Sequence, residues 1–133
     1  MWIISWSGCI AGWFALPIVV RSRPESVRRF IRNGQPLIAA IETYRIENGR
    51  YPDRAAELVP RYIKRIPYTS AVGYSEFAYK RAQPGNRFHT YQLSVYMSYG
   101  FGNFDDLLYR PEKDYSEYGK GIERFGEWGY YHE

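Results

Sequence analysis

Three oxygen-bearing side chains in the carboxyl half of the chain are of the types that bind a hard metal ion. Asn103, Asp105 and Asp106 fall within one window of four residues. Carboxylate and amide oxygens are the ligands that Ca²⁺ prefers, but calcium takes about six to eight oxygens. Because this window offers three side chains, we expect a solvated turn before a strand. A calcium site completed by Glu112 and Asp114 is the alternative.

No other pattern in the sequence predicts catalysis. The two histidines, His89 and His132, fall in different predicted strand regions, so we expect each at a sheet edge or terminus rather than at a metal. No glycine-rich phosphate loop follows a strand, and no serine lies in a nucleophile elbow. The sequence therefore predicts a non-enzymatic protein without a cofactor.

An uncharged apolar run opens the chain. Trp2 to Val20 is 19 residues long, and Arg21 and Arg23 follow directly. A helix of that length spans about 28 Å, close to the thickness of a hydrocarbon core. We expect residues 1–23 to form a single-pass anchor with a basic flank in a bacterial inner membrane, and a cleaved signal or lipoprotein is the alternative.

The positive charge lies next to this run. Residues 1–32 hold five arginines and one acid, whereas residues 33–133 hold 13 lysines and arginines and 13 acids. A neutral domain offers no electrostatic surface to phosphates, which argues against nucleic acid as a partner. We expect the flank to contact anionic lipid headgroups. Its basic residues are Arg21, Arg23, Arg28, Arg29 and Arg32.

Apolar residues then recur every three or four positions, which predicts an amphipathic helix. The stripe keeps its phase through Gly34 and Pro36, so we expect one bent helix or two in close succession. Asn48-Gly49 tolerates the left-handed conformation that ends helices, and Tyr51-Pro52 forbids continuation. Asp53 is placed to cap a short second helix. The stripe comprises Val27, Phe30, Ile31, Leu37, Ile38, Ile41 and Tyr44.

Beyond residue 75 the apolar period changes to two, which is typical of half-buried strands. The clearest strand is Tyr91 to Ser98, with Glu76 to Arg81 as its partner across the turn Pro84-Gly85-Asn86. Asp106 to Arg110 and Trp128 to His132 are further strands. Residues 24–133 therefore predict one α+β domain in which a helix packs on three or four antiparallel strands.

Aromatic residues are frequent in this second half and allow two interpretations. Large amphipathic rings can thicken the core of a small sheet, which is the interpretation we prefer. Exposed rings would instead make the protein a membrane-anchored binding module for cell-wall glycan or peptide. Burial of five rings decides between the two: Tyr96, Tyr115, Tyr118, Trp128 and Tyr130.

The stretch Leu37 to Pro67 resembles the helix end and following loop of type II secretion pseudopilins and type IV pilins. The matching elements include Asn48-Gly49 and Tyr51-Pro52, and the proline at 17 lies as far upstream as the one in the pilin membrane helix. The resemblance implies a pilin-like fold with a protruding amino-terminal helix. It also implies a structural or interaction role, with secretion or envelope proteins as partners.

The resemblance also bears on topology. It implies a periplasmic domain, whereas the arginines that follow the apolar run place the domain in the cytoplasm by the positive-inside rule. We expect the periplasmic side. The basic leader and early glutamate of pilins are absent, and the first acid is Glu25. We therefore expect a pilin-like protein that stays in the bilayer.

Overall fold

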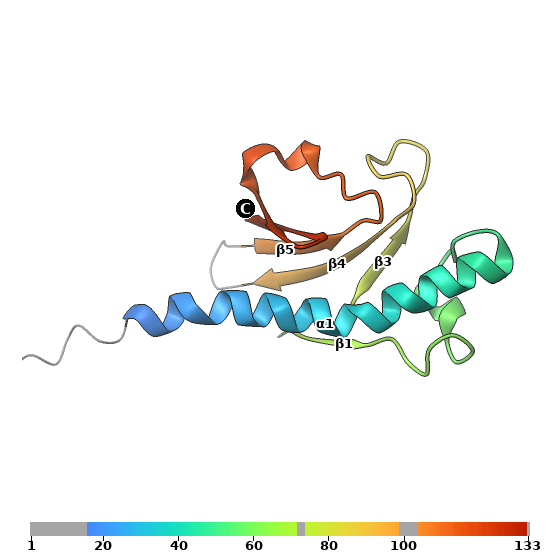
Figure 1. Ribbon diagram of the computed structural model, residues 1–133, viewed down its shortest axis with the longest axis horizontal. Helices are drawn as coiled ribbons and strands as arrows, with labels where there is room; N and C mark the ends of the chain where they lie inside the picture. The colour runs from blue at the N-terminus through green and yellow to red at the C-terminus, as the bar shows by residue number, and fades with distance from the viewer. Residues whose placement is uncertain (1–15, 72–73, 99–103, 133) are drawn as a thin grey trace, which may run out of the picture.

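A computed structural model describes residues 16–71, 74–98 and 104–132 of the chain (Figure 1). One long helix lies along a twisted antiparallel sheet, and the polypeptide between β5 and β6 arches over the side of the sheet away from the helix. The elements in chain order are α1 (Leu16–Asn48), η1 (Ala55–Leu58), β1 (Tyr68–Ala71), β2 (Tyr74–Glu76), β3 (Ala78–Arg81), β4 (Tyr91–Ser98), β5 (Phe104–Tyr109), η2 (Ser116–Gly121), β6 (Ile122–Phe125) and β7 (Trp128–His132).

The sheet has five strands in the order β3-β4-β5-β7-β6, and each neighbouring pair is antiparallel. Strands β1 and β2 form a separate two-stranded sheet. Alternation along each strand sends one set of side chains to α1 and the other set to the opposite face. The chain thus forms a helix layer, a sheet, and a covering segment on the far side.

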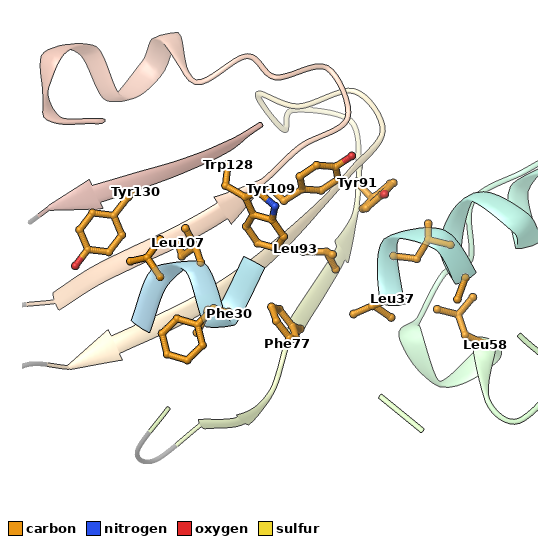
Figure 2. Close-up of a cluster of buried hydrophobic side chains, with 14 of the residues drawn as sticks. Phe30, Leu37, Leu58, Phe77, Tyr91, Leu93, Leu107, Tyr109, Trp128 and Tyr130 are labelled. Atoms are coloured by element: carbon orange, nitrogen blue, oxygen red, sulfur yellow. The ribbon is translucent and has the colours of Figure 1, made fainter. Parts of the chain in front are cut away.

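The core lies between α1 and the near face of the sheet (Figure 2). The predicted stripe of α1 is confirmed, since Val27, Leu37 and Ile41 are fully buried. Gly34 lets the helix approach closely: a Cβ there would lie 3.0 Å from the ring of Trp128. The main sheet residues of this core are Tyr91, Leu93, Val95, Met97, Leu107, Tyr109, Trp128 and Tyr130.

The predicted strands of the fold differ from those of the structure. The main sheet has five strands rather than three or four, because the sequence analysis missed β6 at its edge. The predicted strand 76–81 is instead divided between β2 and β3, which separate at the buried Phe77. The helix is continuous through Pro24, Gly34 and Pro36. Of the two arrangements expected from the sequence, the structure therefore has the single helix.

The membrane-spanning part of the predicted fold is also wrong. Within residues 16–71, 74–98 and 104–132, no helix has the length and apolar character needed to cross a bilayer. Helix α1 carries nine charged residues among its 33, so its apolar residues form a single stripe. This finding contradicts the predicted single-pass anchor and the inner-membrane localisation derived from it. Residues 2–15 of the apolar run lie outside the described residues.

The end of α1 is built as its sequence predicts. Gly49 has φ = 72°, and its N–H donates to the carbonyl of Arg45 at 2.8 Å. This left-handed residue after the last turn closes the helix. An added Cβ would find open space there, so any cost of substitution comes from the backbone conformation.

Replacing Gly49 with valine is therefore expected to lower the free energy of unfolding by about 1 kcal/mol or more, because a β-branched residue resists positive φ. Gly49→Asn is the matched control, since asparagine tolerates this conformation and should lose less. Chemical denaturation of both variants measures the difference. Equal stability of the two variants would contradict the proposed role of Gly49 as the residue that ends the helix.

Candidate functional site

The structure separates the residues of the predicted calcium site. Asp105 and Asp106 are consecutive in β5, so their side chains point to opposite faces of the sheet. Asp105 is buried and accepts a hydrogen bond of 2.5 Å from the Tyr130 hydroxyl. Asp106 lies on the far face, and Asn103 lies outside the described residues. In the described part of the chain, no cluster of histidine, cysteine, aspartate and glutamate is placed to hold a metal ion.

The two acids of the next loop have local partners. Glu112 accepts hydrogen bonds of 2.6 Å from the backbone N–H of His89 and from the hydroxyl of Thr90. Asp114 accepts one of 3.0 Å from the N–H of Ser116. Both carboxylates therefore hold loops in place.

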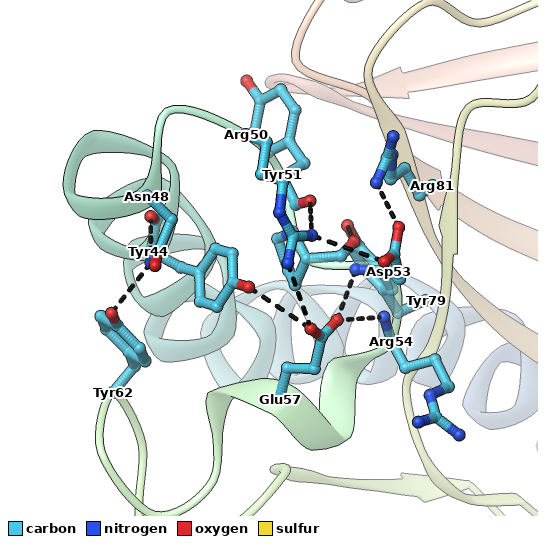
Figure 3. Close-up of polar contacts among 11 residues, drawn as sticks. Tyr44, Asn48, Arg50, Tyr51, Asp53, Arg54, Glu57, Tyr62, Tyr79 and Arg81 are labelled. Atoms are coloured by element: carbon cyan, nitrogen blue, oxygen red, sulfur yellow. Dashed lines mark hydrogen bonds and ion pairs between the residues drawn. The ribbon is translucent and has the colours of Figure 1, made fainter.

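The motif after α1 forms a polar network that fastens the loop to the helix (Figure 3). The side-chain amide of Asn48 donates to the Tyr44 carbonyl at 2.9 Å and to the Tyr62 hydroxyl at 3.0 Å. The Tyr62 hydroxyl donates in turn to Glu47 at 2.6 Å. The Pro52 carbonyl accepts a bond of 2.6 Å from the Tyr79 hydroxyl of β3. Asn48 and Pro52 thus help to fasten this loop to α1 and to β3.

Asp53 does not cap the short helix η1, contrary to the sequence prediction. Glu57 takes that place, because its carboxylate accepts the backbone N–H groups of Asp53 and Arg54 at 2.5 and 2.9 Å. Those backbone hydrogen bonds lower the pKa of Glu57, the bond from Arg54 most strongly. Asp53 instead pairs with Arg81 of β3 (Figure 3).

The aromatic residues of the carboxyl half do not form an open platform. Tyr115, Trp128 and Tyr130 are no more than 3% exposed, and Tyr96 and Tyr118 are half-buried. These five rings therefore act mainly as core, which is the interpretation that the sequence analysis preferred.

A buried arginine, which the sequence did not single out, organises the far face of the sheet. Arg110 is 2% exposed and donates to Gln92 at 2.8 Å, to the Asp114 carbonyl at 3.0 Å and to Glu117 at 2.7 Å. Its guanidinium also lies 5.1 Å from the ring centroid of Phe88. This arrangement satisfies a buried charge and fastens the segment over the sheet. Nothing in the alternation of β5 distinguishes Arg110 from a solvent-facing cation.

A basic groove runs between α1 and the segment that leads into β1. Its volume is about 550 Å³. Three cations line it, Arg32 from α1 and Lys64 and Arg65 from the segment, and no acid is among the lining residues. None of the three forms an ion pair in the described part of the chain. The full lining is Arg32, Asn33, Pro36, Ile63, Lys64, Arg65, Pro67 and Tyr68.

The groove includes one of the five arginines predicted at the basic flank. Arg32 lines it, and Arg28 and Arg29 are exposed on the same helix, whereas Arg21 and Arg23 lie in the first turns of α1. The sequence analysis missed Lys64 and Arg65. They line the same groove as Arg32 because the loop returns beside α1. This brings together residues about 30 positions apart in the sequence, which no local pattern predicts.

Replacing Arg110 with methionine is expected to lower the free energy of unfolding by about 3 kcal/mol, because the half-buried Glu117 and Gln92 lose their buried partner. Arg124→Met is the matched control: this exposed arginine stacks on Tyr115, and its loss should cost about 1 kcal/mol or less. Urea denaturation measures both. Similar losses in the two variants would contradict the role of Arg110.

The ion pair between Arg110 and Glu117 also predicts that the free energy of unfolding depends on pH. The hydrogen bond from Arg110 lowers the pKa of Glu117 in the folded state, so the pair stabilises above the ordinary glutamate pKa of about 4.3. That stability is lost as the pH falls through the lowered value. The difference in unfolding free energy between wild type and Glu117→Gln should be full at neutral pH and shrink below about pH 4. A difference that stays constant down to pH 3, or that persists in the Arg110→Met background, would contradict this cause.

Comparisons with family models, with curated proteins and with solved structures found no match for this chain. Its function is therefore inferred from the chain's own residues. Among these, the basic groove brings together three cations that form no ion pair with the residues that the structure describes.

Proposed function

We propose that this chain is a non-enzymatic interaction domain that binds an anionic segment of a partner protein in the basic groove between α1 and residues 63–68. The observation that carries the proposal is the charge of the groove. Arg32, Lys64 and Arg65 line one open groove without an acid among the lining residues. Cations arranged in this way attract and orient a partner of opposite charge.

The contrast with other arginines of the chain supports this proposal. Arg45, Arg81 and Arg110 each pair with a carboxylate, whereas the three groove cations, like the exposed Arg28 and Arg29, form no ion pair with described residues. A side chain that already pairs within its own chain gains little from a second partner in water. The groove cations therefore have the larger capacity to bind a partner.

The chemistry of the lining favours binding over catalysis. The eight residues around the groove include no carboxylate, imidazole, thiol or serine hydroxyl, and the two lining groups that can transfer a proton, Lys64 and Tyr68, are exposed to water. The groove is open to solvent, and its volume of about 550 Å³ is within the size range of small-ligand sites.

The class of partner is the next part of the proposal. No family model supports the pseudopilin resemblance of Leu37 to Pro67, so secretion or envelope proteins remain only the partner class that the sequence led us to expect. A glycan or peptide site on exposed aromatic rings has no support from the geometry, because Tyr115, Trp128 and Tyr130 are buried.

Charge reversal tests the proposal. Labelled poly-L-glutamate should bind the full chain, and Lys64→Glu should weaken that binding about ten-fold or more, because a repulsive charge enters the groove. Raising the salt from about 50 mM to about 500 mM should weaken wild-type binding as well. Fluorescence anisotropy measures both effects.

Lys120→Glu is the matched control, since Lys120 is exposed in η2 and makes the same change of charge away from the groove. It should retain most of the affinity. Equal loss in the two variants, or the absence of any binding by the wild type, would overturn the proposed function.

A further inference from the structure

The groove has an apolar surface beside its cations. Pro36, Ile63, Pro67 and Tyr68 form this part of the lining. Tyr68 is 55% exposed and is one of three large apolar residues that are exposed in the described part of the chain. An exposed aromatic ring inside a recess favours a partner that covers it with apolar surface.

The groove offers little backbone for pairing with a partner strand. The amide of Asn33 already donates to the Tyr68 carbonyl at 3.2 Å. Pro36 and Pro67 have no N–H group to donate. A partner in this recess is therefore recognised through its side chains rather than as an added strand of β1.

The cations and the ring lie next to each other. The guanidinium of Arg65 is 5.6 Å from the centroid of the Tyr68 ring. A carboxylate bound by Arg65 consequently lies beside the exposed ring. A ligand with one acidic and one aromatic side chain close together in sequence would satisfy both groups at once.

From this arrangement we infer that the groove selects an extended acidic peptide in which an aromatic side chain accompanies the carboxylates. This inference rests on the proposed function and adds the class of side chains that the partner must present. Arg32, Lys64 and Arg65 bind the carboxylates, and Tyr68 packs against the aromatic ring.

The charge of the chain beyond residue 32, which includes Lys64 and Arg65 of the groove, favours a peptide over a nucleic acid. Residues 33–133 hold equal numbers of acids and of lysines and arginines, 13 of each. A surface that tracks a phosphate backbone needs cations along its length, and this groove holds three. A short acidic segment matches that number better.

Two labelled peptides of equal charge test the inference with the full chain, Glu-Glu-Trp-Glu-Glu and Glu-Glu-Ala-Glu-Glu. The tryptophan peptide should bind the wild type about five-fold more tightly. Tyr68→Ala should abolish that preference while leaving the affinity for the alanine peptide unchanged. Ile46→Ala is the matched control, because Ile46 is 75% exposed on α1 and is not part of the groove lining; it should preserve the preference.

The outcomes separate this inference from the proposed function. Equal binding of both peptides, still weakened by Lys64→Glu, would overturn the aromatic requirement and leave the anionic groove intact. Binding of neither peptide would overturn both. Tighter binding of an oligothymidylate or of phosphatidylglycerol vesicles, weakened by the same Lys64→Glu change, would overturn the peptide assignment in favour of a phosphate-bearing partner. Thermal melting of each variant checks that the fold is retained.

Discussion

The close contact between α1 and the sheet at Gly34 is the constraint on which the remaining structure depends. A Cβ at this position would lie 3.0 Å from the Trp128 ring, tighter than ordinary contact, so the absence of a side chain sets how near the helix lies. This approach buries Val27, Leu37 and Ile41 against the sheet. It also orients the helix so that the opposite side of the same turns carries Arg32, which lines the groove. Core and groove thus follow from one packing arrangement.

Buried and exposed cations differ in whether they need partners within the chain, because only the buried ones lose their hydration on folding. Arg110 is removed from water, so it is stable only because Gln92, Glu117 and a backbone carbonyl replace its hydration. The groove cations remain hydrated and need no partner for folding. Lys64 and Arg65 can therefore serve binding without a large cost to stability.

Local sequence patterns predicted the elements whose physical origin is local. The period-two alternation predicted β4 and β7, and the three-to-four spacing predicted the buried stripe of α1. Asn48-Gly49 predicted the helix end, because positive φ is a property of the residue itself. Strand β6 was missed because its four residues, Ile122–Phe125, carry two adjacent charges and have only a short apolar signal. The predicted membrane anchor is contradicted because the described end of the apolar run, Leu16 to Val20, continues as one helix into a charged stretch, and no part of that helix is long and apolar enough to cross a bilayer.

The sequence alone therefore determined the helix stripe, the helix end at Gly49 and most strands, since each depends on the conformational preferences of neighbouring residues. Only the tertiary structure decided which distant side chains meet. Alternation in β5 sends Asp105 and Asp106 to opposite faces, and the covering segment brings Glu117 to Arg110. The return of the loop beside α1 creates the basic groove. These contacts join residues far apart in the chain, and their formation depends on packing that no short window of sequence encodes.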